Sequence, residues 1–90
     1  MPSSFRYKPV VCRWVDSCEP ADNSDVPAED FPTPQIITSL GWLTKSEPDY
    51  IVVAGAEKVD DHAFTTFDYV ITIPRVAVLN LSEISLPENV

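Results

Sequence analysis

Asp60, Asp61 and His62 form the one cluster in the sequence whose residue types suggest metal binding or proton transfer. Carboxylates and imidazole bind divalent cations and act as general bases. Adjacent residues in an extended chain point to opposite sides, however, and the chain contains a single histidine. We therefore expect a solvated loop here, with no metal and no cofactor, whose two carboxylates are available to a partner.

A nucleophile beside a base is the second chemistry to consider. Ser17 and Cys18 follow Asp16, but a base would have to come from His62, far along the chain. Asp16 and Ser17 fit better as a turn at a strand end, where their oxygens accept backbone N–H groups. Two isolated glycines do not make a phosphate-binding loop. The sequence predicts no catalytic residues and no enzyme.

The chain has two cysteines, Cys12 and Cys18, whose spacing is not that of a zinc site. A disulfide would require an oxidising compartment, and the first residues contain no apolar segment of a secretory signal. We expect a buried thiol at Cys12 and a more exposed thiol at Cys18.

The charge balance narrows the classes of partner. Six lysines and arginines stand against 14 aspartates and glutamates, which gives a net charge of −8. This balance argues against nucleic acid and anionic membranes as partners. The longest apolar run, residues 51–56, is far shorter than the ~20 residues of a transmembrane helix.

The acidic residues gather in residues 16–30 and 47–61. A surface of this kind is complementary to a basic protein, and its attraction falls as salt rises. The candidate contact residues, which include one arginine, are Asp22, Asp25, Glu29, Asp30, Asp60, Asp61 and Arg75.

Short strands must position these residues. Ninety residues suffice for a single domain, and nine prolines with two glycines disfavour long helices. Alternation of apolar and polar residues predicts strands over residues 8–16, 35–45, 50–56, 66–73 and 76–81. Residues 17–34 are expected to form a long, acidic, proline-rich loop that Phe31 holds against the body. Residues 57–66 are expected to form a second acidic loop, and residues 82–90 a polar tail.

This pattern predicts an all-β fold, a small five-stranded SH3-like barrel with the long acidic loop after its first strand. An OB-like barrel and a small β-sandwich are the alternatives. Arg75 follows Pro74, where such a barrel makes a tight turn, and is expected to pair with an acidic residue such as Asp16 or to contact a partner.

Several side chains can be assigned to faces. The face of Val10, Cys12 and Trp14 is expected to be the core face of the first strand, because Arg13 lies on the other. Trp14 and Trp42 are either both core or part of an exposed aromatic platform for proline-rich peptides. Gly41 predicts a bend, a bulge or close packing. In the fourth strand one face is predicted to carry Phe67, Tyr69, Ile71 and Ile73.

Three segments, in this order, resemble small uncharacterised proteins of tailed bacteriophages. They are Trp14-Val15-Asp16-Ser17, Ser39-Leu40-Gly41-Trp42-Leu43 and Ile73-Pro74-Arg75-Val76-Ala77-Val78. The chain departs from that family in the long acidic loop after Ser17, and Leu40 replaces the usual valine. The resemblance implies a phage origin and a location in the cytoplasm of the infected host. It carries no known activity.

Three hypotheses for the function follow. We favour a non-enzymatic phage accessory protein that binds a host bacterial protein through its acidic surface, in host takeover or anti-defence. The second is a small-ligand or nucleotide-sequestering protein, which for an anionic ligand requires Arg6, Lys8, Arg13 and Arg75 to converge. The third is a virion assembly protein, a homo-oligomer that associates through strand edges.

Overall fold

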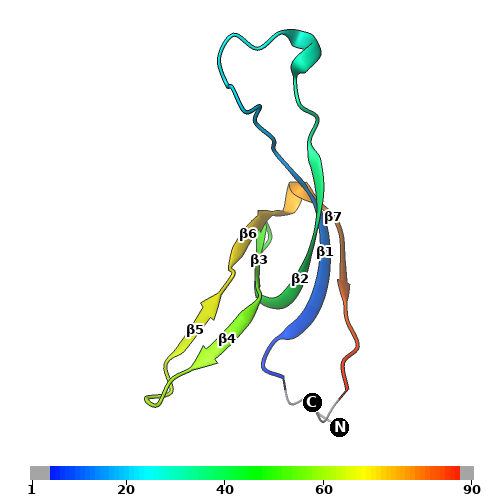
Figure 1. Ribbon diagram of the computed structural model, residues 1–90. Coiled ribbons are helices and arrows are strands. Elements are labelled where there is room, and N and C mark those ends of the chain that lie inside the picture. Colours follow the sequence, from blue (N-terminus) through cyan, green and yellow to red (C-terminus); the bar gives the residue numbers. More distant parts are fainter. Residues whose placement is uncertain (1–4, 88–90) are drawn as a thin grey trace.

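The computed structural model describes residues 5–87 and is built from antiparallel strands (Figure 1). The strands are β1 (Lys8–Asp16), β2 (Gln35–Ser46), β3 (Tyr50–Ala54), β4 (Ala56–Val59), β5 (Thr65–Asp68), β6 (Ile71–Pro74) and β7 (Val78–Glu83). The helical segments within residues 5–87 are two short 3-10 helices, Ala28–Asp30 and Arg75–Ala77. The predicted all-β class is confirmed, and β1 has the predicted bounds.

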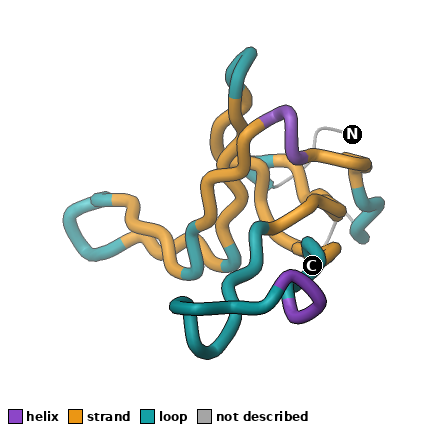
Figure 2. The backbone as a smooth tube through the Cα atoms, turned by 90° about the horizontal axis from the view of Figure 1, so that it is seen from above, coloured by secondary structure: helices purple, strands orange, loops and turns teal. Residues whose placement is uncertain are grey.

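Five strands form one antiparallel sheet in the order β6-β3-β2-β1-β7, and β4 and β5 pair separately as an arm. The sheet is strongly curved when seen from above (Figure 2). The two outer strands, β6 and β7, do not pair with each other in the described part of the chain. The closed barrel that we predicted is therefore not formed by hydrogen bonding, although the five-stranded antiparallel sheet is present.

The bend in β2 allows this strand to pair on both sides. Its whole length to Leu43 pairs with β1, and from Trp42 onward it also pairs with β3, with a register shift between Leu43 and Lys45. A Cβ on Gly41 would lie 2.5 Å from the carbonyl oxygen of Ala54, so the close approach of β3 requires glycine here. The predicted close packing at Gly41 is confirmed, and the irregularity of β2 lies further along, between Leu43 and Lys45.

The core is formed mainly by residues of β1, β3 and β6. Its buried residues are Val10, Cys12, Trp14, Ile51, Val53, Ala54 and Ile73. Trp14 is buried, and its indole N–H donates a hydrogen bond to the Ser39 hydroxyl at 3.0 Å, which satisfies its polar atom. Arg13 is exposed. The predicted core face of β1 is confirmed.

Two predicted strands are each broken into two. The strand predicted over residues 50–56 divides at Gly55 into β3 and β4, and the strand predicted over residues 66–73 divides after Asp68 into β5 and β6. The Gly55 N–H lies near two carbonyl oxygens, those of Asp68 at 3.1 Å and Tyr69 at 3.3 Å. Two residues of one strand thus lie opposite one residue of the other, as in a β-bulge. Tyr69 has φ 57 and is 86% exposed. Our assignment of Tyr69 to one face with Phe67 and Ile73 was wrong, because its backbone reverses the alternation.

Residues 57–66 are also more regular than predicted, since β4 and β5 extend into them and only a tight turn joins the two strands. This β4–β5 arm projects from the sheet (Figure 1). The long loop, residues 17–34, projects from the other end of the molecule, which measures 56 × 28 × 25 Å. Phe31 in this loop is 63% exposed, so the prediction that it holds the loop against the body was wrong.

The end of the described chain returns to the sheet. The 3-10 helix Arg75–Ala77 forms the predicted tight turn after Pro74, and β7 then pairs with β1. β7 begins two residues later than predicted, because Val76 lies in the helix and is exposed. The N–H of Ile84 donates to the Pro9 carbonyl at 2.8 Å, so the start of the predicted tail is docked, whereas residues 88–90 lie outside the described residues.

Candidate functional site

The long loop, residues 17–34, concentrates uncompensated negative charge. It carries five exposed acidic side chains and no lysine or arginine: Glu19, Asp22, Asp25, Glu29 and Asp30. The ion pairs of the described chain involve none of them. Three of the aspartates line a hollow of about 310 Å³ that the loop encloses. Asp22 also accepts the N–H of Ser24 at 3.3 Å, which shapes the local turn.

The cations lie on the body, and most are already engaged. Three form ion pairs, Arg6 with Glu57 at 3.1 Å, Lys8 with Glu83 at 3.9 Å and Lys58 with Asp68 at 3.0 Å. The Lys45 ammonium lies over the Tyr50 ring, and its pKa is raised by a hydrogen bond to Tyr50. The positive charge is therefore spread over the sheet, the 3-10 helix Arg75–Ala77 and the β4–β5 arm, and none of it lies within the loop.

Arg75 stabilises the turn between β2 and β3. Its Nε donates to the Glu47 carbonyl at 3.0 Å and its Nη2 to the Ser46 hydroxyl at 2.6 Å, while its backbone N–H donates to the Asp49 carbonyl. The suggested ion pair with Asp16 is absent from the described contacts. Arg75 therefore serves the turn between β2 and β3.

Asp60 and Asp61 lie in the turn of the β4–β5 arm, separated from the long loop by the sheet (Figure 1). One carboxylate oxygen of Asp60 accepts the N–H groups of His62 and Phe64, each at 2.8 Å, so this residue shapes the turn. Among residues 5–87 no group of three or more histidine, cysteine, aspartate or glutamate side chains could hold a metal ion.

The groups considered for nucleophilic catalysis are not brought together. Ser17 and Cys18 begin the long loop, whereas His62 lies in the turn of the β4–β5 arm at the opposite end (Figure 1). Cys12 is buried in the core, and burial raises the pKa of its thiol, which keeps it protonated at neutral pH. Both cysteines are free thiols.

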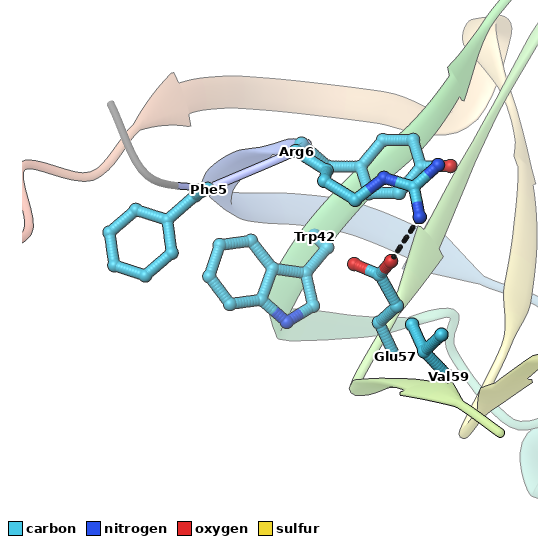
Figure 3. Close-up of a pocket in the computed structure, with 6 residues that line it drawn as sticks. Phe5, Arg6, Trp42, Glu57 and Val59 are labelled. Atoms are coloured by element: carbon cyan, nitrogen blue, oxygen red, sulfur yellow. Dashed lines mark hydrogen bonds and ion pairs between the residues drawn. The ribbon is translucent and has the colours of Figure 1, made fainter. Parts of the chain in front are cut away.

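A pocket that the sequence did not reveal lies at the end of the molecule away from the loop. Its volume is about 270 Å³, and it is lined by Phe5, Arg6, Tyr7, Trp42, Glu57 and Val59 (Figure 3). Phe5 and Tyr7, two aromatic residues spaced two apart just before β1, are the one hint of it in the sequence. None of Lys8, Arg13 and Arg75 lines it with Arg6, so the four cations required for an anionic ligand do not converge here.

Contacts between aromatic rings build the pocket. Phe5 packs on Trp42 with ring centroids 5.3 Å apart, and Tyr7 meets Phe67 edge to face at 5.6 Å. Arg6 closes one side, since its Nη1 donates to Glu57 at 3.1 Å and to the Thr65 hydroxyl at 3.2 Å. Of the two tryptophans, Trp14 thus belongs to the core and Trp42 to this half-buried aromatic surface.

Comparisons with protein-family models, with curated proteins and with solved structures gave no match to this chain. Within residues 5–87 no helix is long and apolar enough to cross a membrane.

Proposed function

We propose that this chain is a non-enzymatic accessory protein of a tailed phage, which binds a basic surface of a host bacterial protein through the loop of residues 17–34. The observation that carries the proposal is the separation of charge. Five exposed carboxylates stand on a projecting loop that contains no cation, and none of them has an ion-pair partner in the described chain.

Electrostatics supports this assignment. A net charge of −8 attracts a basic partner over a distance of about 8–10 Å at physiological salt, and concentrating charge on one loop orients the encounter. Exposed loops on a rigid sheet are also where binding residues usually stand. Phage origin and location in the host cytoplasm rest on the resemblance of the three segments around Trp14, Gly41 and Pro74.

The arrangement of the strands supports the finer description as an SH3-like barrel. The order β6-β3-β2-β1-β7, a bent second strand and a 3-10 helix before the last strand are all features of that fold. In this description β7 is the fifth barrel strand, the loop of residues 17–34 is the long first loop, and the β4–β5 arm extends the hairpin between the third and fourth barrel strands.

The test is capture of partners from bacterial lysate at low and at moderate salt, with identification by mass spectrometry. We expect one near-stoichiometric partner that is lost as salt rises. A double variant of the loop, Glu29→Lys with Asp30→Lys, should weaken binding of this partner at least tenfold. The matched control, Asp49→Lys with Asp61→Lys, changes the net charge equally outside the loop, in the β2–β3 turn and in the arm, at two exposed residues that form no ion pair.

Equal loss in both double variants would assign the effect to overall charge and contradict a role for the loop. Full binding by the loop variant would contradict the proposal altogether.

A further inference from the structure

Besides its carboxylates, the loop of residues 17–34 exposes a short apolar segment. After Asp30 the chain reads Phe31-Pro32-Thr33-Pro34, and all four residues are exposed. Phe31 has φ −61 and ψ 125, close to the polyproline II conformation, and the following prolines fix their own φ. This segment is thus a short, preorganised, exposed peptide of the kind that aromatic grooves bind.

The pocket at the other end of the molecule has the complementary chemistry. It is lined by the rings of Phe5, Tyr7 and Trp42 and by the exposed side chain of Val59, with the ion pair of Arg6 and Glu57 completing the lining. Its volume of about 270 Å³ is just below that of ordinary small-ligand sites, ~300–1,000 Å³, and suits one or two side chains. The half-buried Trp42 has no hydrogen bond from its indole N–H within residues 5–87, so this donor is available to a carbonyl group.

Hydrogen-bond donors at the rim of the pocket also complement the carboxylate next to the segment. Arg6 uses only Nη1 for Glu57 and Thr65, which leaves its Nε and Nη2 donors without a partner in the described structure. The Arg6 side chain is 60% exposed at the rim of the pocket. Asp30 directly precedes Phe31, so an aromatic residue in the pocket would bring a carboxylate to this rim.

The loop does not reach its own pocket. Phe31 is four residues from Gln35, a span of at most about 14 Å. Trp42 lies seven residues along β2 from Gln35, about 23 Å away along the strand, and the loop points away from the sheet (Figure 1). Only another molecule can place Phe31 in the pocket.

We propose that the pocket around Trp42 binds the segment of residues 31–34 of a second copy of this chain, with Phe31 inserted and Asp30 against Arg6. Donor and acceptor surfaces lie at opposite ends, so the contact is head to tail and leads to rings or open chains. The interface is small and the association is therefore weak, in the range of transient contacts. The net charge of −8 on each copy opposes it, so it strengthens as long-range repulsion is screened.

The experiment is sedimentation velocity on the full chain from micromolar to millimolar concentration in at least ~0.15 M salt. We expect reversible association. Phe31→Ala should reduce the association constant at least tenfold, and so should Val59→Asp, which places a negative charge in the pocket. Both residues are exposed, so the fold survives, and circular dichroism verifies this. The matched control is Phe64→Ala, an exposed phenylalanine on the arm that does not line the pocket.

Mixing the two variants gives a sharper result. Phe31→Ala retains an intact pocket and Val59→Asp an intact segment, so the mixture should form heterodimers and nothing larger. A monomer at every concentration overturns the proposal, as does equal weakening by Phe64→Ala. Loss of association in Phe31→Ala without loss in Val59→Asp would show that the loop binds another surface and overturns the assignment of the pocket.

Discussion

Gly55 and Tyr69 face each other at the base of the β4–β5 arm. The Gly55 N–H lies 3.3 Å from the Tyr69 carbonyl oxygen, and a Cβ on Gly55 would lie 3.0 Å from the Cβ of Tyr69. Tyr69 is held at φ 57, a left-handed conformation that costs an aromatic residue about 1–2 kcal/mol. The pairing of the arm and the absence of a side chain on Gly55 together accommodate this conformation.

Gly41→Ala should destabilise the protein more than Gly55→Ala. A methyl group at position 55 would lie 3.0 Å from the Tyr69 Cβ, a contact that a small shift relieves, and we expect a loss of about 1–2 kcal/mol. A methyl group at position 41 meets the backbone carbonyl of Ala54 at 2.5 Å, and we expect about 3 kcal/mol or more. Urea unfolding measures both, and equal losses would contradict this distinction.

Relief of the backbone strain at Tyr69, which has φ 57, should stabilise the protein. Asparagine tolerates the left-handed region, so Tyr69→Asn is expected to raise the free energy of unfolding by up to about 1 kcal/mol. Phe67→Asn is the control, because Phe67 packs on Tyr7 and its replacement should destabilise. A clear destabilisation by Tyr69→Asn in thermal or urea unfolding would show that the exposed ring contributes packing that outweighs the strain.

Ser39→Ala should cost about 1–2 kcal/mol, because the indole N–H of the buried Trp14 loses its acceptor. Thr38→Ala is the neighbouring control, exposed on the outer face, and should change stability by less than about 0.5 kcal/mol. The two free energies of unfolding are compared in urea. Similar values would indicate that water replaces the hydroxyl group.

Stability should fall as the pH rises above about 9. Burial raises the pKa of the Cys12 thiol above its ordinary value, so the unfolded chain releases this proton at lower pH than the folded one. The contribution is complete below the unfolded pKa and is lost as the pH rises toward the folded pKa. The measurement is urea unfolding between pH 7 and 10.5 for the natural chain and for Cys12→Ala, and the difference between them should shrink above pH 9. A constant difference would contradict the prediction.

Arg75→Lys should destabilise the turn between β2 and β3 by about 1–2 kcal/mol, because lysine cannot donate to Glu47 and Ser46 together. Arg13→Lys, at an exposed arginine without an ion pair in the described chain, is the control and should be neutral. Stability is measured by thermal unfolding. If Arg75→Lys leaves it unchanged, the structural role of Arg75 is contradicted, and Arg75 is again a candidate residue for contact with a partner.

The strands that could be predicted are those in which apolar and polar residues alternate without a break along the whole strand. In β1 the apolar residues Val10, Cys12 and Trp14 alternate with residues that include Arg13. Side chains of a strand alternate between its two faces, so this pattern gives both the bounds of β1 and its core face. The breaks after Ala54 and Asp68 depend on a glycine in one segment meeting a tyrosine in another, and alternation within each segment does not contain that information.

The pocket could not be predicted for the same reason. Phe5 and Glu57 lie far apart in the sequence and meet only because β4 turns away from β3 at Gly55. Phe31 was misplaced because a lone large apolar residue in a polar loop is expected to dock on its own chain, whereas this side chain is exposed.

The pairing of Asp16 with Gln35 closes the base of the long loop. The sheet therefore holds both ends of the loop at a fixed separation, whatever lies between them. Loop closure becomes costlier by only about 0.6 kcal/mol for each doubling of length, so residues 17–34 form a replaceable cassette. Foreign peptides, affinity tags or whole small domains can be grafted there while the sheet keeps its register.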